Sequence, residues 1–260
     1  MIRIFSYLPN PRVWKALIAA ELCGVDVEVV GDKPRALASW LWDFDARQLD
    51  ESERTEDSPF ARTSRRGFSG TLYKTDDFIK AQPFGTVPAA FSSDGSVGIF
   101  ESNSILRAVV RASDTDHDLY GRDHFVASRI DSFLDATLVF AREAQVYLLA
   151  AAEMTDETYV RMSAAFEFYL NGIEQALSEN SHVACEELTI ADIAMTCDVA
   201  QFLRERLMAD RLAKNDFEPI SCDLETDYPQ VTAHLRRLAE SPVFKNYLAE
   251  TIAQTLPEGP

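Results

Sequence analysis

Residues 85–91 read Gly-Thr-Val-Pro-Ala-Ala-Phe, and the turn-forming tetrapeptide Ser-Ser-Asp-Gly follows at residues 92–95. Because Val87 precedes a proline, its backbone is restricted to extended conformations, and a turn here can hold the Val87–Pro88 bond cis. The N–H and C=O of Val87 would then face outward and could pair, as in a strand, with a small peptide. The stretch predicts a hairpin that carries an open peptide-binding edge.

The residues after the turn predict the second strand and the start of a helix. Residues 97–100 are extended in character, and an apolar-periodic run begins directly after Glu101 and Ser102. A hydroxyl and an N–H at a helix N-terminus favour a carboxylate, and Glu101 beside them can take an ammonium group. One short stretch could therefore hold both ends of a γ-glutamyl group. An ordinary hairpin followed by a capped helix would show the same spacing.

The N-terminal residues predict the elements that precede this hairpin. Residues 2–7 alternate like a strand, and a helix over residues 11–23 is favoured by Asn10 as its cap and Gly24 as its C-terminal stop. Strict alternation over residues 25–30 predicts a second strand. Strand, helix, strand, hairpin and helix is the order of a thioredoxin-like domain.

The C-terminal half is helical in its periodicity from about Asp123 onward. One apolar stripe is formed by Phe125, Ile130, Phe133, Leu134 and Leu138. The expected architecture is an α+β thioredoxin-like domain over residues 1–112 and an all-helical domain over residues 123–260.

Four motifs carry a resemblance to a known family. The 85–88 stretch with Glu-Ser-Asn at 101–103 resembles the glutathione-binding half of the cytosolic glutathione S-transferase superfamily. Residues 10–21 resemble the transferase-like domain of the elongation factor 1B gamma subunit and its bacterial relatives. Residues 119–134 look like the start of the family's helical domain, and residues 188–194 resemble its buried capping box, in which Thr189 and Asp192 satisfy a helix start.

The resemblance implies the residues that bind glutathione as a co-substrate. Glu101 and Ser102 match the positions that hold the γ-glutamyl end, and Val87 with Pro88 matches the backbone partner of the cysteinyl unit. Gln82 is a weaker match to a polar position of the family.

The resemblance also implies a group that turns the bound thiol into a thiolate, since a free thiol with a pKa of about 8.5 is mostly protonated at neutral pH. The unpaired N–H groups at the start of the helix over residues 11–23 are expected to assist. The candidates for the activating side chain are Asn10 first, then Tyr7 and Ser6, with Arg12 as an electrostatic helper. Asn10 could equally be a plain N-cap.

The reaction that the resemblance implies is attack of the thiolate on an electrophilic carbon of a hydrophobic, aromatic small molecule. Phe140, Arg142 and Tyr147 are the candidate walls of its pocket, although aromatics at helical spacing also suit a core. Aromatic content and an extra segment suggest the glutathione-dependent β-aryl etherases that open lignin dimers. The alternatives are a non-catalytic interaction module and a silent subunit of a heterodimer.

Residues 34–66 look like an insertion relative to the family pattern. A connection of this length is typically a functional lid or disordered. Trp40 and Trp42 are expected to pack against the rest of the protein or across a dimer contact, and the acidic residues 50–57 to be solvated and mobile. Arg62, Arg65 and Arg66 could bind carboxylates of glutathione, but balancing the nearby acids is the favoured interpretation.

Composition sets the remaining expectations. The chain has 260 residues, a formal net charge of −17 and a pI near 4.6, which argues against nucleic acid or an anionic membrane as partner. Its four cysteines show neither disulfide nor metal-ligand spacing, so no metal is expected and a reducing cytoplasm suits the chain. No apolar run approaches the roughly 20 residues of a membrane span. The family resemblance implies a dimer, either of identical chains or with a related one.

Overall fold

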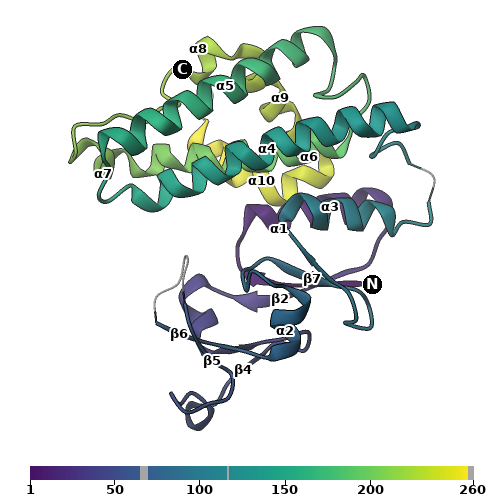
Figure 1. Ribbon diagram of the computed structural model, residues 1–260. Coiled ribbons are helices and arrows are strands. Elements are labelled where there is room, and N and C mark those ends of the chain that lie inside the picture. Colours follow the sequence, from purple (N-terminus) through teal and green to yellow (C-terminus); the bar gives the residue numbers. More distant parts are fainter. Residues whose placement is uncertain (65–69, 116, 257–260) are drawn as a thin grey trace. The chain divides into compact units, whose positions relative to one another are not determined.

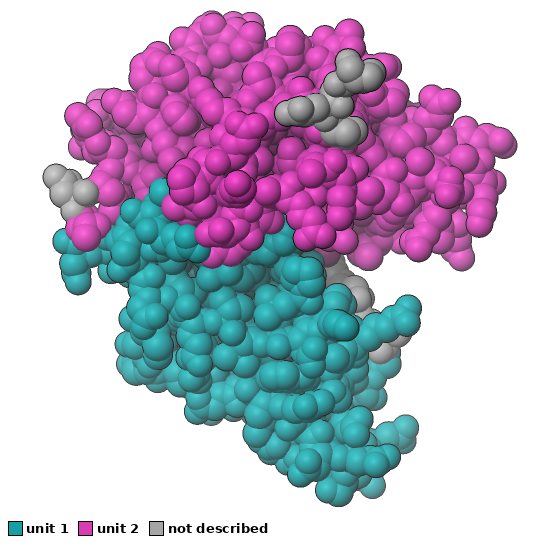
Figure 2. All heavy atoms as spheres, turned by 180° about the vertical axis from the view of Figure 1, so that it is seen from behind, with its two compact units in different colours: residues 1–114 teal, residues 115–260 magenta. Residues whose placement is uncertain are grey.

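The computed structural model describes residues 1–64, 70–115 and 117–256 (Figure 1). It divides into two compact units, residues 1–114 and 115–260, which Figure 2 colours separately. The first unit holds a mixed four-stranded sheet with helices, and the second is helical. The expected fold class is confirmed.

The first unit starts with β1 (Ile2–Tyr7), α1 (Pro11–Cys23) and β2 (Val27–Asp32). Asn10 caps α1, because its side chain accepts the backbone N–H of Arg12, and Gly24 ends the helix at a φ of 68°. The strand expected at residues 25–30 begins two residues later, and its strict alternation is wrong, since every residue of β2 is partly exposed. β2 lies at an edge of the sheet, where neither face is fully covered.

The hairpin and the helix behind it form as expected. β7 (Ala89–Phe91) pairs antiparallel with both β1 and β8 (Gly98–Phe100), which gives the sheet order β2-β1-β7-β8. α3 (Ser102–Arg111) follows, and α1 and α3 pack against each other. The Val87–Pro88 peptide bond is cis.

The insertion builds a second sheet instead of a lid or an unstructured loop. Three of its strands are β3 (Trp40–Trp42), β4 (Arg47–Gln48) and β5 (Ala61–Thr63), and the fourth strand is β6 (Thr71–Lys74). The strand order is β4-β3-β6-β5, with β3 and β6 parallel. Two 3₁₀ turns, η1 (Pro34–Ser39) and η2 (Glu51–Glu53), lie within it, and α2 (Asp76–Ala81) follows.

Aromatic side chains join the two sheets into one core. Trp42 is 1% exposed, and its ring centroid lies 5.5 Å from that of Phe5 on β1 and 5.8 Å from that of Phe78 on α2, edge-on in both cases. Trp40 lies 6.0 Å from Phe5. The expectation that the two tryptophans pack against the rest of the protein is confirmed, and edge-to-face pairs of this kind add to the free energy gained by burial alone.

The acidic part of the insertion is exposed and locally ordered by its own charges. Asp50 and Glu53 form a capping box around η2, and Arg47 donates to both carboxylate oxygens of Glu53 at 2.9 and 2.6 Å. The solvated character predicted for this segment is confirmed for these residues.

The second unit consists of long helices around a buried one (Figure 1). The bounds are α4 (His124–Ala150), α5 (Asp156–Glu179), α6 (Ile190–Leu203), η3 (Arg204–Met208), α7 (Ala209–Ala213), α8 (Leu224–Asp227), α9 (Pro229–Glu240) and α10 (Pro242–Thr255). Every residue of α6 except Gln201 is buried, and α4 and α10 pack against this helix. The capping box of Thr189 and Asp192 at its start is confirmed.

The predicted apolar stripe on α4 is only partly right. Ile130 and Leu134 are fully buried, but Phe125, in the first turn of the helix, is 76% exposed. Among residues 1–64, 70–115 and 117–256, no helix combines the length and apolar composition that a membrane span requires.

Candidate functional site

The turn before Pro88 is held by the side chain of Gln82. Its amide nitrogen donates to the carbonyl and the hydroxyl of Thr86 at 2.9 and 2.7 Å, and its amide oxygen accepts the N–H of Phe84 at 2.8 Å. Gln82 is 1% exposed. The expectation that it binds a ligand directly is therefore wrong, because its polar atoms shape the loop.

Val87 keeps an open backbone edge. β7 begins only at Ala89, and in the described part of the chain neither the N–H nor the C=O of Val87 has a hydrogen-bond partner. Val87 is partly exposed, whereas Pro88 is buried. This is the edge to which an extended peptide can add.

Glu101 adopts an unusual backbone conformation at the start of α3. Its φ is 65° and its ψ is 127°, and its exposed side chain makes no capping hydrogen bond. A non-glycine residue held at positive φ costs on the order of 1–3 kcal/mol, and such strain is concentrated at ligand sites. The conformation presents the carboxylate of Glu101 to solvent beside the N-terminus of α3.

A buried lysine that sequence reasoning missed supports the same helix start. Lys15 on α1 is 1% exposed, and its ammonium donates to Asn103 Oδ1 at 2.8 Å and to Ser102 Oγ at 3.2 Å. The charge of Lys15 thus adds to the positive end of the α3 dipole. Its position on the buried side of α1 was the available signal, since a charged residue there needs a polar partner.

A second buried cation lies at the other end of the loop. Lys74 on β6 is 9% exposed, donates to the carbonyl oxygen of Gly85 at 2.6 Å, and lies 4.5 Å from the ring centroid of Trp42. Burial lowers its pKa from 10.5 to about 8. Among the described residues no carboxylate pairs with it. An anionic ligand could therefore neutralise the charge of this buried ammonium.

The residues expected to activate a thiol fall into two groups. Ser6 is fully buried and Asn10 is 1% exposed, and Asn10 Nδ2 donates to Ser6 Oγ at 3.0 Å while Oδ1 caps α1. These two side chains hold the β1–α1 junction together instead of facing outward. Asn10 therefore acts as an N-cap, the alternative to its expected role in thiol activation. Tyr7 and Arg12 are partly exposed at the same junction.

The helix start offers no unpaired N–H group to a thiolate, which corrects a further expectation. Pro11 has no N–H, the N–H of Arg12 is taken by Asn10 Oδ1, and the N–H groups of Val13 and Trp14 both bond the carbonyl of Asn10. The field of the helix and the partly exposed side chains of Tyr7 and Arg12 can still stabilise an anion there.

Sequence comparisons give distant relatives. No protein-family model matches the chain. Elongation factor 1-gamma 1 from Oryza sativa subsp. japonica is 27% identical over 245 residues, which are 93% of this chain and 47% of that protein. The glutathione S-transferase-like protein LUC7 of a Fusarium species is 25% identical over 195 residues, 74% of this chain and 73% of that protein. The chain thus spans about half the length of the rice elongation factor.

Solved structures show the same fold along almost the whole chain. A glutathione S-transferase from Methylobacillus flagellatus, solved with glutathione bound, matches at a TM-score of 0.64 and 15% identity over 95% of this chain and 98% of that one. Isozyme E7 from Drosophila melanogaster matches at 0.64 and 19% identity over 98% and 94%.

The chain has the glutathione S-transferase fold. Two of the predicted substrate residues in the helical unit of this transferase fold are core residues. Phe140 is 1% exposed and stacks on Tyr169 with ring centroids 4.5 Å apart. Tyr147 is equally buried, and its hydroxyl donates to Glu205 at 2.7 Å. Burial raises the pKa of both Tyr147 and Glu205.

The packing of the helical unit therefore places Phe140 and Tyr147 in its core. The recess that Tyr147 borders has a volume of about 70 Å³, far below the roughly 300 Å³ of small ligand sites. Arg142 is exposed on the opposite side of α4 and is available to a ligand.

Of the three arginines of the insertion that could bind carboxylates of glutathione, only Arg62 lies within the described residues. Its guanidinium bonds Asp76 at 2.8 Å and the carbonyls of Pro59 and Ala61 at 2.7 and 2.9 Å. The favoured interpretation, that it balances nearby acids, is confirmed for this residue. Arg65 and Arg66 lie outside the described residues.

Proposed function

We propose that this protein binds glutathione along Val87 and transfers its sulfur to an electrophilic carbon of a hydrophobic, aromatic small molecule. The observation that carries the proposal is the open backbone edge of Val87 within a transferase fold, flanked by the strained Glu101. The cysteinyl unit pairs with Val87, and the γ-glutamyl carboxylate and ammonium meet Ser102 and Glu101.

The two buried lysines complement the two carboxylates of glutathione. Lys15 lies behind Ser102, where the γ-glutamyl carboxylate would sit at the start of α3. Lys74 lies at Gly85, two residues before Val87, where the glycyl carboxylate of an extended peptide can reach it. An ion pair would relieve the cost of burying the Lys74 ammonium.

We assign thiol activation to Tyr7 and Arg12. Both are partly exposed at the β1–α1 junction, whereas Ser6 and Asn10 are buried. A phenol can donate a hydrogen bond to the thiolate, and a guanidinium lowers the pKa of a nearby thiol.

The test of this function is a pH titration of the ultraviolet thiolate absorbance of glutathione bound to the pure protein. A thiol pKa well below the ordinary value of about 8.5 in the wild type, restored by Tyr7→Phe or by Arg12→Gln, supports catalysis and identifies the activator. Saturable binding with an unshifted thiol contradicts it and favours the second candidate.

The second candidate is a non-catalytic transferase-like module or silent subunit. It is favoured by one observation, the match of 93% of this chain to elongation factor 1-gamma proteins. A screen with β-aryl ether dimers separates a β-etherase from other transferases, because cleavage releases a phenol whose absorbance is followed directly.

We also propose that the protein is cytoplasmic and that it forms a dimer. The four free cysteines suit a reducing cytoplasm. A second copy of this chain, or of a related one, would cover the exposed apolar side chains of α4 and α5, among them Val139, Leu149, Val160 and Phe168.

A further inference from the structure

Asp192 is the centre of a buried cluster that its capping role does not explain. His182 Nδ1 lies 3.2 Å and His234 Nε2 lies 3.1 Å from the same oxygen, Asp192 Oδ1. Asp192 is fully buried and His234 is 3% exposed. Three ligand atoms from three segments, the loop before α6, α6 itself and α9, thus meet within 4.8 Å of one another.

Backbone groups fix the orientation of the carboxylate. Thr189 N–H donates to Oδ2 at 2.8 Å, and Val183 N–H donates to Oδ1 at 2.9 Å. The cluster therefore presents a carboxylate whose direction is set by an outer layer of hydrogen bonds, as in metal sites.

One nitrogen of the His234 imidazole, Nε2, has no hydrogen-bond partner among the described residues. Although Nε2 lies 3.1 Å from Asp192 Oδ1, it is buried and makes no hydrogen bond of acceptable geometry within the described part of the chain. The His182 and His234 rings stand nearly perpendicular, at 83°, with centroids 5.5 Å apart. Adjacent ligands of a tetrahedral ion with bonds of about 2.0–2.1 Å are about 3.3 Å apart, close to the two nitrogen–oxygen spacings here.

We propose that His182, Asp192 and His234 form a site for one divalent transition-metal ion of the zinc type. Two imidazoles and one carboxylate, with a fourth position for water, are a donor set that Zn²⁺ accepts. The ion would join the loop before α6 to α9. This site is independent of the proposed transferase chemistry.

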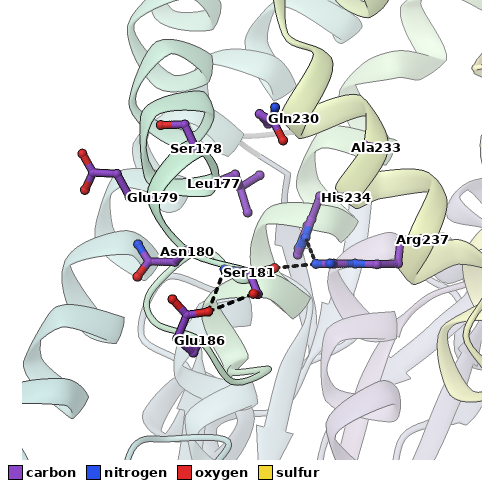
Figure 3. Close-up of a pocket in the computed structure, with 10 residues that line it drawn as sticks. All are labelled: Leu177, Ser178, Glu179, Asn180, Ser181, Glu186, Gln230, Ala233, His234 and Arg237. Carbon is purple, nitrogen blue, oxygen red and sulfur yellow. Dashed lines mark hydrogen bonds between the residues drawn. The ribbon is translucent and has the colours of Figure 1, made fainter.

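A cavity in the second unit borders the cluster at His234. This cavity of about 370 Å³ is lined by ten residues, including Ser181, Glu186, His234 and Arg237. Figure 3 shows the side chains of His234 and Arg237 lying next to each other from α9, with Ser181 close by. The side chain of His182 is 18% exposed, so water can also reach the cluster from its side.

In the metal-free protein, Arg237 stabilises a tautomer of His234 that cannot bind an ion through Nε2. Its guanidinium donates to His234 Nδ1 at 2.7 Å. Because a guanidinium only donates, Nδ1 must accept and the proton of the neutral ring sits on Nε2. Binding an ion at Nε2 requires that this proton move to Nδ1 and that the hydrogen bond from Arg237 to Nδ1 break.

Competition between Arg237 and the ion for His234 predicts an effect on metal affinity that a purely structural cluster would not show. Arg237→Gln removes both the donor that fixes the wrong tautomer and a positive charge beside the site. It should therefore tighten Zn²⁺ binding by about tenfold. Lys245→Gln, an exposed lysine on α10, is the matched loss of charge and should leave the affinity unchanged.

The experiment uses tag-free, chelator-treated full-length protein titrated with Zn²⁺ by calorimetry and with Co²⁺ by visible absorption. We expect one ion per chain and the intense visible bands of four-coordinate Co²⁺. His182→Gln, at the exposed edge of the cluster, should weaken binding about tenfold or more while the far-ultraviolet circular dichroism stays unchanged. Cys185→Ser should bind as the wild type does, because no thiolate belongs to the donor set.

Three outcomes would overturn the site. They are no saturable binding of either ion, binding that survives His182→Gln, and binding that is lost in Cys185→Ser or accompanied by thiolate charge-transfer bands. Equal affinities of the wild type and Arg237→Gln would disprove the competition between the guanidinium and the ion.

Discussion

The ammonium nitrogen of Lys74 donates to the carbonyl oxygen of Gly85 at 2.6 Å. Lys74 ends a strand of the second sheet, and Gly85 belongs to the loop that leads into the cis Val87–Pro88 bond. Gly85 has a φ of 60°, and a Cβ at this position would lie 3.3 Å from the Lys74 ammonium, so the close approach depends on glycine. The inserted sheet is thus tied directly to the proposed peptide site.

The first prediction concerns the charge of Lys74 in binding. S-methylglutathione, which has no thiol to titrate, should bind the wild type more weakly as the pH rises through about 8, because the ammonium that meets the glycyl carboxylate is lost there. Lys74→Met should bind about tenfold more weakly at neutral pH and show no such dependence. Calorimetry at several pH values measures both.

Lys80→Met, an exposed lysine on α2, is the control and should behave as the wild type. γ-Glutamylcysteine, which lacks the glycyl unit, should not distinguish Lys74→Met from the wild type. A loss of affinity for both peptides would instead mean that Lys74 only shapes the loop.

The second prediction concerns stability in the absence of ligand. The pKa of Lys74 is about 8 in the folded protein and near its ordinary 10.5 in the unfolded chain, so the unfolded chain binds more protons between these values. The free energy of unfolding should therefore gain a rising contribution from this residue as the pH increases from about 8 to about 10.5. Urea unfolding of the wild type and Lys74→Met should show this contribution in the wild type alone.

The third prediction separates strain from binding at Glu101. Glu101→Gly can adopt the φ of 65° without cost, whereas Glu101→Ala cannot, so the glycine variant should be more stable by about 1 kcal/mol in urea unfolding. Both lack the carboxylate that meets the ligand's ammonium and should lose glutathione affinity to the same extent. Wild-type affinity in either variant would contradict the proposed contact.

The fourth prediction concerns Asn10. Asn10→Ala removes the cap of α1 and the partner of Ser6 Oγ, and it should lower the free energy of unfolding by about 1–2 kcal/mol. The pKa of bound glutathione should stay as in the wild type, since the amide of Asn10 is buried. A thiol restored to its ordinary pKa in a folded Asn10→Ala protein would return the activating role to this residue.

Local signals sufficed for much of the fold. The cap at Asn10, the stop at Gly24, the turn at residues 92–95 and the capping box at Thr189 each act within a few residues, so the sequence alone located the elements. The second sheet could not be predicted in this way, because β3 and β6 pair in parallel across about 30 residues of intervening chain.

Site residues could be predicted where their role depends on local backbone conformation, but not where it depends on burial in the folded protein. The cis bond at Pro88 and the helix start at Ser102 follow from neighbouring residues. Phe140 and Gln82 could not be assigned from the sequence, since only the packing shows that both are buried. Lys74 was missed because the residues that surround it, Trp42 and Gly85, are distant in the chain.

The fifth prediction concerns the exposed apolar side chains of α4 and α5. Phe168 is 82% exposed and Val139 is 65% exposed, so burying them against a second copy would gain free energy that a charged residue opposes. Phe168→Glu should shift the protein from dimer to monomer in sedimentation velocity. Glu167→Gln, the exposed neighbour on the same helix, is the control. A monomeric wild type would contradict the proposed assembly.

The burial of α6 has a consequence for how the chain is made. Because nearly every residue from Ile190 to Leu203 is covered in the folded unit, this helix has no polar face to show to water. Part of its cover is α10, which ends at Thr255, about fifty residues later in the chain. A nascent chain can cover α6 with α4 as soon as α6 is made, but the side that packs against α10 stays exposed until the last helix has left the ribosome.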